Sequence, residues 1–236
     1  MKGSTIELTK PIRSRKGTRA LLRHHRRART GRISGTRGLH DLLELYEGIN
    51  GFNASTLGLL DYKTTYGEVS GAGIKTLSEK FSQYGSLEKF PAGQKTFFDL
   101  GSGIGRVVLG IAILHPEIQA RGIEIVPDRV RFSQQALGRL HTKQILDRIQ
   151  NGHGNILDPL LNLRSACWIF ISNLCFDGPT QEKLAEKLEA ECQPGTVIIS
   201  SREMPFAQTS HFVIQEKNCQ VHMTWSNTST CLIYKK

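Results

Sequence analysis

The amino-acid sequence predicts an α/β fold with a doubly wound, mostly parallel β-sheet that ends in antiparallel strands. Apolar, strand-like runs alternate with helical patterns between residues 96 and 201, and helices of this kind connect parallel strands. Residues 211–235 then contain two or three strand-like runs without a helical pattern between them. These last runs are therefore expected to form an antiparallel edge of the same sheet.

Apolar spacing and turn residues place the individual elements. Short apolar runs predict strands at 96–100, 119–125, 167–174 and 196–201. Apolar residues at helical spacing predict helices at 39–46, 74–81, 106–115, 128–148 and 181–192. Glycines predict turns at 101–105 and 152–154.

The net charge of +10 is concentrated in one segment. Residues 1–40 carry 12 Lys and Arg against one acid, Glu7, whereas residues 41–236 have a net charge of −1. Such a run of like charges does not fold alone and is expected to be a flexible arm. It suits contact with DNA phosphates or another acidic partner, and a solvated tail or a nuclear import signal is the alternative.

The composition also limits the class of protein. No apolar run reaches the ~18 residues of a membrane span, and the first residues lack the apolar region of a signal peptide. The five Cys are scattered, with no CxxC pair and no zinc-like spacing with His. They indicate reduced thiols in an intracellular protein, and neither a metal nor a membrane partner is expected.

The strongest local signal is the segment 97–105, where a strand ends in Asp99 and glycines follow at 101, 103 and 105. Glycine tolerates positive φ and lets a ligand approach the backbone closely. The G-x-G-x-G spacing differs from the dinucleotide-binding G-x-G-x-x-G. An acid before the loop would repel a pyrophosphate but pair with an ammonium group, which fits S-adenosyl-L-methionine.

A second acid, Glu124, ends the next predicted strand. A carboxylate at that place accepts hydrogen bonds from both ribose hydroxyls of a nucleoside. The alternative is an ordinary strand, turn and helix with incidental acids.

Two weaker signals lie at later strand ends, where ligands bind in this fold. Ser172 and Asn173 could face a transferring methyl group and an incoming amine, or serve as a cap beside core aromatics. Asn155 and Ile156 could present an amide and an apolar face to adenine.

Taken together and in order, these segments resemble a known family. The matching motifs are YGE (66–68), FFDLGSGIGR (97–106), GIE (122–124), GNIL (154–157), IFISNLCFDG (169–178) and VIISSREMPF (197–206). They resemble the non-SET, seven-strand histone H3 lysine methyltransferases of the disruptor-of-telomeric-silencing family. The resemblance implies a class I methyltransferase (Rossmann-like) fold of seven strands that binds S-adenosyl-L-methionine.

The resemblance also implies the roles of individual residues. A loop, Tyr66 to Val69, is expected to cover the cofactor, with Ser172, Asn173 and Tyr66 at the reacting groups. The cofactor-binding residues it implies are Tyr66, Gly67, Glu68, Val69, Phe97, Phe98, Asp99, Leu100, Gly101, Ser102, Gly103, Ile104, Gly105, Arg106, Glu124, Asn155 and Ile156.

This sequence departs from the family's motifs at several of these positions. Val69, Arg106 and Asn155 stand where the family has Thr, Gln and Asp. Ser172 replaces the first residue of an Asn-Asn pair that lines the family's lysine channel. An aromatic residue expected near the C-terminus is either Trp225 or Tyr234.

The domains and function implied are the following. Residues 1–40 form the arm, 41–95 a helical subdomain with the cofactor-covering loop, and 96–236 the cofactor-binding core. The expected activity is methyl transfer to a lysine ε-amine of histone H3 in nucleosomes, in the nucleus. Two alternatives are a methyltransferase acting on RNA or a non-histone protein, and a catalytically weakened chromatin-binding module.

Overall fold

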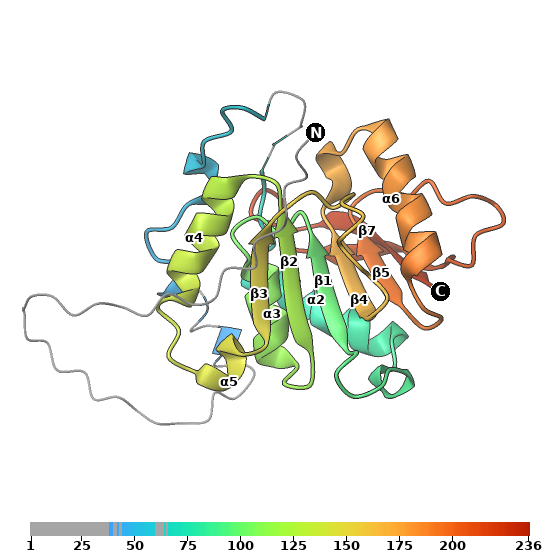
Figure 1. Ribbon diagram of the computed structural model, residues 1–236, viewed down its shortest axis with the longest axis horizontal. Helices are drawn as coiled ribbons and strands as arrows, with labels where there is room; N and C mark the ends of the chain where they lie inside the picture. Colours follow the sequence, from blue (N-terminus) through green and yellow to red (C-terminus); the bar gives the residue numbers. More distant parts are fainter. Residues whose placement is uncertain (1–37, 40–41, 43, 60–63, 65) are drawn as a thin grey trace, which may run out of the picture.

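The computed structural model describes residues 38–236 apart from 40, 41, 43, 60–63 and 65. These residues form one seven-stranded sheet in the order β3-β2-β1-β4-β5-β7-β6 (Figure 1). The parallel strands are β1 (Thr96–Leu100), β2 (Gln119–Glu124), β3 (Ile149–His153), β4 (Ala166–Ile171) and β5 (Val197–Ser200). The antiparallel strands are β6 (Val213–Val221) and β7 (Ser229–Lys235). The predicted sheet, mostly parallel with antiparallel C-terminal strands, is confirmed.

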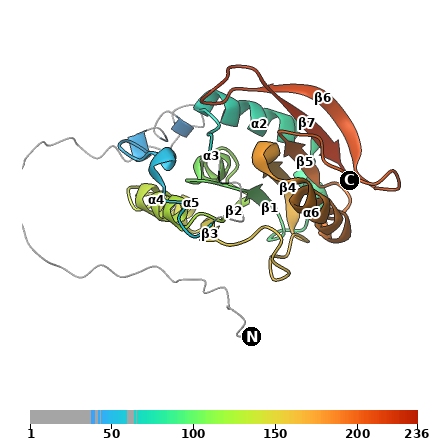
Figure 2. The ribbon, with the colours of Figure 1, turned by 90° about the horizontal axis from the view of Figure 1, so that it is seen from above.

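Helices cover both faces of this sheet. They are α2 (Gly71–Tyr84), α3 (Arg106–Leu114), α4 (Pro127–Leu137), α5 (Lys143–Leu146) and α6 (Gly178–Glu191). Short 3₁₀ turns lie at η1 (Gly51–Asn53), η2 (Leu87–Lys89) and η3 (Asn173–Cys175). In Figure 2, α2 and α3 lie on one side of the sheet and α6 lies on the other. The sheet is therefore a buried middle layer, as parallel sheets require.

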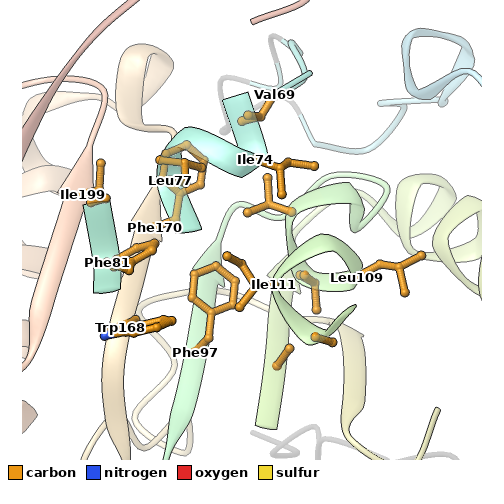
Figure 3. Close-up of a cluster of buried hydrophobic side chains, with 14 of the residues drawn as sticks. Val69, Ile74, Leu77, Phe81, Phe97, Leu109, Ile111, Trp168, Phe170 and Ile199 are labelled. Atoms are coloured by element: carbon orange, nitrogen blue, oxygen red, sulfur yellow. The ribbon is translucent and has the colours of Figure 1, made fainter. Parts of the chain in front are cut away.

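Two apolar cores lie on the two faces because successive strand residues point to opposite sides. Phe97 of β1 packs with α2 and α3, whereas Phe98 and Leu100 pack with α6. In the first core, Phe81 stacks on Trp168 at 5.2 Å between ring centroids and meets Phe97 edge-on at 5.7 Å (Figure 3). This packing fixes β1 and β4, and with them the polar residues at their carboxyl ends.

Two predicted elements differ from the structure. The single helix expected at 128–148 is wrong: α4 ends at Leu137, Gly138 caps it, and only the four residues of α5 follow. Glycine is a poor helix residue, and the break brings Leu140 and Ile145 into the core. The turn expected at 152–154 is also largely wrong, because β3 extends through His153 and pairs with β2.

Most of the predicted arm, residues 1–37, lies outside the described residues. Gly38 is buried and Leu39 packs against the first core, so two described residues of the segment predicted as arm belong to the folded domain. No helix among the described residues is long and apolar enough to cross a membrane.

Candidate active site at the carboxyl ends of the strands

Two adjoining cavities lie beyond the carboxyl ends of β1, β2 and β4. The larger has a volume of about 420 Å³ and is bordered by Glu124, Asn155 and Ile156. The smaller, about 30 Å³, is bordered by Asp99, the glycine loop and Arg106. By the ~10–15 Å³ that one water needs, it has room for two or three water-sized groups. The residues that border both cavities are Tyr66, Gly67, Gly101, Ser172 and Trp225.

The glycine loop connects β1 to α3 and requires its glycines. Gly101, Gly103 and Gly105 have φ of 93°, 55° and 79°, a region that other residues rarely adopt. A Cβ atom on Gly103 would lie 2.6 Å from Cε2 of Tyr66. The backbone therefore closes against the covering loop at a distance that only glycine permits.

Asp99 lies at the base of the smaller cavity, almost fully buried. Among the residues that the structure describes, none forms a hydrogen bond with its Oδ1. Burial, together with repulsion from Glu124, raises the pKa of Asp99 well above its usual range. Buried polar atoms without a partner are rare in folded proteins, so this oxygen fits a site for a cationic group such as the ammonium of S-adenosyl-L-methionine.

Glu124 ends β2 and borders the larger cavity. Its Oε2 accepts a hydrogen bond from the Gly103 N–H at 2.7 Å, and its Oε1 accepts one from the Val126 N–H at 2.9 Å. A carboxylate has about four acceptor positions, so further hydrogen bonds from ribose hydroxyls remain compatible with this arrangement. Glu124 thus couples the glycine loop to the nucleoside side of the site.

The predicted covering loop is held by its own side chains and by the C-terminal hairpin. The Tyr66 hydroxyl donates to Oε1 of Glu68 at 2.8 Å, and Glu68 exchanges hydrogen bonds with Thr224. Val69 forms a β-bridge with Met223. Burial and the Glu68 carboxylate raise the pKa of Tyr66, so this hydroxyl is a neutral donor and is unsuited to act as a base.

Arg129 of α4 is a site residue that the sequence patterns did not single out. It borders the larger cavity, and its guanidinium lies 4.3 Å from the centroid of the Tyr66 ring. Its Nη2 donates to the Thr64 carbonyl at 2.6 Å, and its Nη1 lies 3.5 Å from Oε1 of Glu124. Arg129 therefore ties the covering loop to the end of β2.

The two neighbours Ser172 and Asn173 have different surroundings. Ser172 borders both cavities. Asn173 is fully buried and borders neither; its amide donates to Gln181, and its Oδ1 accepts from the Arg202 N–H at 2.8 Å. The expectation that Asn173 faces the reacting groups does not agree with this placement, because its hydrogen bonds join β4 to α6 and the 202 loop.

The remaining predicted site residues also form two groups: some border a cavity and others lie in an apolar core. Asn155 and Ile156 border the larger cavity, and Oδ1 of Asn155 accepts from the Leu157 N–H at 2.9 Å. Phe97, Phe98 and Leu100 border neither cavity and lie in the two cores. These three support the site through the backbone of β1. Ser102 and Ile104 border the smaller cavity.

Of the two aromatic candidates near the C-terminus, the structure places Trp225 in the site. Trp225 borders both cavities and is 48% exposed. A Cβ atom on Gly67 would lie 1.9 Å from its ring. Tyr234 lies in β7 instead, where its buried hydroxyl accepts from the Met204 N–H.

The chain also shows a distant likeness to two solved methyltransferase structures. The glycopeptide N-methyltransferase MtfA complexed with S-adenosyl-L-methionine is 15% identical, with 62% of each chain covered and a TM-score of 0.45. The mitomycin 7-O-methyltransferase MmcR is 12% identical, with 71% of this chain and 55% of that chain covered and a TM-score of 0.47. At this similarity, they add nothing to the site argument.

Two curated relatives are histone-lysine N-methyltransferases described as H3 lysine-79 specific. The Drosophila melanogaster protein is 26% identical over 161 residues, and the Caenorhabditis elegans protein is 29% identical over 121 residues. The matches cover 64% and 47% of this chain but only 8% and 13% of the relatives' own length.

A family model described as histone methylation protein DOT1 matches residues 55–236. The matched range includes the glycine loop, the covering loop and Trp225. It confirms the expected cofactor, S-adenosyl-L-methionine, and the class I methyltransferase fold. The chain belongs to the DOT1 family of histone methylation proteins.

Proposed function

We propose that this protein transfers a methyl group from S-adenosyl-L-methionine to a lysine ε-amine of histone H3 in nucleosomes. The observation that carries the proposal is the junction of the two cavities, bordered by Tyr66, Ser172 and Trp225. If Asp99 holds the amino-acid end of the cofactor and Glu124 holds its ribose, the sulfonium lies between them. The proposed reaction therefore takes place at this junction.

The residues of the chain would hold the cofactor as follows. Asp99 pairs with its ammonium, Glu124 accepts from its ribose hydroxyls, and Asn155 with Ile156 contacts its adenine. When bound, S-adenosyl-L-methionine supplies a methyl group on a sulfonium, which a neutral amine can displace. Arg129 and Glu68 keep the covering loop in place through their contacts with Thr64, Glu124 and Tyr66.

The lysine must lose its proton before it attacks, since its ordinary pKa is about 10.4. A site bordered by the Tyr66 and Trp225 rings disfavours the ammonium form through desolvation, and the cationic cofactor adds repulsion. The proton then leaves to solvent. We assign no general base, because the Tyr66 hydroxyl donates to Glu68. Alignment and exclusion of water are the proposed source of the rate.

Histone H3 is proposed as substrate because both curated relatives carry that description. The Arg-rich residues 1–40 are proposed to hold DNA phosphates or an acidic histone surface, and the nucleus is the compartment this implies. The arm carries 12 Lys and Arg, a charge that suits binding which weakens steeply with salt.

The proposal is tested by supplying radiolabelled methyl donor to nucleosomes, free histones and RNA in parallel. We expect label in histone H3 of nucleosomes and a loss of that label in Asp99→Ala and Glu124→Ala variants. Label in RNA alone would replace the histone proposal. Cofactor binding without any label would support a catalytically weakened chromatin-binding module instead, which the Ser172 and Val69 replacements favour.

A further inference from the structure

The loop that follows β5 lies next to the proposed site of reaction but outside the cofactor cavities. β1 and β2 carry the proposed cofactor residues Asp99 and Glu124, and β4 and β5 continue the sheet away from them. Ser172 follows β4 and borders both cavities. None of residues 197–206 is among those that border either cavity. This loop is therefore placed to meet the substrate protein and not the cofactor.

Arg202 of this loop is an exposed residue with a fixed backbone. Its N–H donates to Oδ1 of Asn173 at 2.8 Å. Its carbonyl accepts from Nδ2 of Asn173 at 3.3 Å and from the Ser200 hydroxyl at 2.7 Å. Asn173 and Ser200 are both fully buried, whereas Arg202 is exposed. Because folding has already ordered this backbone, a contact made by the Arg202 side chain costs less entropy when a partner binds.

The Arg202 guanidinium lies at the rim of the larger cavity. Its Nη1 donates to the carbonyl of Leu174 at 3.4 Å, and Leu174 borders this cavity and is 42% exposed. No carboxylate in the described part of the chain forms an ion pair with Arg202. A guanidinium has five N–H donors in one plane, a geometry that suits a carboxylate. Most of these donors are thus directed to no described residue and can serve a group outside the chain.

We propose that Arg202 binds a carboxylate on the substrate protein, close to the lysine that is methylated. The inference rests on the proposed function and adds which lysines the enzyme accepts: those with an Asp or Glu beside them on the same protein surface. A Lys or Arg at that place would be repelled, and such repulsion supplies specificity more than affinity. Arg202 is in this way a specificity-determining residue that touches the substrate and not the cofactor.

Two other roles of Arg202 predict different results. A structural role, in which Arg202 only closes the loop onto Leu174, would not depend on the charges of the substrate. A contact with DNA phosphates would depend on salt but not on the acidic residues of a histone. Reversing the charge on both sides of the proposed contact separates these roles, because only a direct pair is restored when both charges are exchanged.

The experiment measures kcat/KM for methyl transfer to nucleosomes, after mass spectrometry has located the methylated lysine of histone H3. Each Asp or Glu of H3 near that lysine is replaced by Lys in turn. We expect Arg202→Gln to lower kcat/KM for unaltered nucleosomes about 2- to 5-fold, the range for an exposed ion pair, and Arg202→Glu to lower it further, about tenfold. One Lys-substituted nucleosome should be a poorer substrate for the wild type and a better one for Arg202→Glu.

Glu203→Gln is the matched control, since it changes the charge of the next exposed residue. It should keep the wild-type order of preference among the nucleosomes, and all variants should keep wild-type affinity for S-adenosyl-L-methionine in calorimetry. Unchanged kcat/KM in Arg202→Glu would overturn the inference. A loss that no Lys-substituted nucleosome restores would overturn it as well, in favour of DNA contact if the salt slope changes and of a structural role if it does not. Wild-type protein that methylates no nucleosome would remove the proposed function, and this inference with it.

Discussion

At the scale of single residues, the site combines two buried acids whose hydrogen-bond partners differ. The two carboxylate oxygens of Glu124 accept hydrogen bonds from the N–H groups of Gly103 and Val126. Oδ1 of Asp99 has no hydrogen-bond partner in the described part of the chain, and burial together with Glu124 raises the pKa of Asp99. Glu124 therefore has hydrogen-bond partners for both oxygens without a ligand, whereas Oδ1 of Asp99 is expected to gain a partner when a cation binds.

Replacing Asp99 with Asn should separate stability from cofactor binding. Because the pKa of Asp99 is higher in the folded protein, the folded state binds more protons, and stability falls as pH rises above the unfolded pKa of about 3.9. Asp99→Asn should therefore raise the free energy of unfolding at pH 7, by about 0.5–2 kcal/mol. Urea unfolding at pH 5 and pH 7 measures this, and a lower stability of the variant at pH 7 would contradict it.

The same substitution should also change the pH dependence of binding. Binding of an ammonium group favours the charged Asp99, so a proton must leave when the pH is below the raised pKa. We expect wild-type affinity for S-adenosyl-L-methionine to rise as the pH increases through the raised pKa of Asp99 and this rise to be absent in Asp99→Asn, with affinity lowered about 10- to 100-fold. Calorimetry in buffers of different ionisation enthalpy detects the released proton.

The neighbours Ser172 and Asn173 should give opposite results when each is replaced by Ala. Ser172→Ala should leave the free energy of unfolding nearly unchanged and lower the rate of methyl transfer, by about tenfold if one hydrogen bond is lost. Asn173→Ala removes hydrogen bonds to Gln181 and Arg202 in a fully buried place, so it should cost about 1–3 kcal/mol of stability. Single-turnover rates and urea unfolding distinguish the two. Equal effects of both changes on the rate would contradict this assignment.

At the scale of elements, the sequence patterns predicted the strands and helices that are determined by residues close together in the sequence. β1 (TFFDL) is a short, mainly apolar run with an acid near its end and glycines after it, so its bounds and the place of Asp99 followed from the sequence. β3 was not predicted, because its sequence IQNGH has little apolar content. Its pairing with β2, which involves residues distant in the sequence, makes it a strand. Arg129 and Trp225 reach the site only through tertiary packing of α4 and the C-terminal hairpin, which no local spacing encodes.

The glycine loop should tolerate no side chain where it meets the covering loop. Gly103→Ala places a Cβ 2.6 Å from Tyr66 at a positive φ, so it should lower the free energy of unfolding by about 1–3 kcal/mol and abolish cofactor binding. Gly152→Ala in β3 is the matched control, since a Cβ there meets nothing within 4 Å. Urea unfolding and calorimetry report both. Full cofactor affinity in Gly103→Ala would refute the close approach.

At the scale of the whole molecule, charge and catalysis are expected to lie in separate stretches of the chain. Residues 1–40 carry a net charge of +11, and residues 41–236 carry −1. The boundary between the charged arm and the core lies before residue 40, because Gly38 is buried and Leu39 packs against the core. A deletion that removes the charge of the arm and keeps these two described residues therefore ends at residue 37.

Deleting residues 1–37 should weaken nucleosome binding and leave cofactor binding intact. The deletion removes all 12 Lys and Arg of the arm, so the slope of log affinity against log salt should become shallower. Nucleosome affinity at several salt concentrations and S-adenosyl-L-methionine affinity at one measure the two effects. An unchanged salt slope would show that the arm does not contact phosphates.

The place of β7 in the sheet has a consequence for how the protein is made. β7 is the last strand along the chain, yet it pairs with β5 on one side and β6 on the other. Until the ribosome has released Ser229 to Lys235, the edges of β5 and β6 that will pair with it stay open. Open strand edges are templates for association with other chains. An mRNA truncated before the codons of β7 would therefore yield a chain with open strand edges, and such a chain is expected to aggregate.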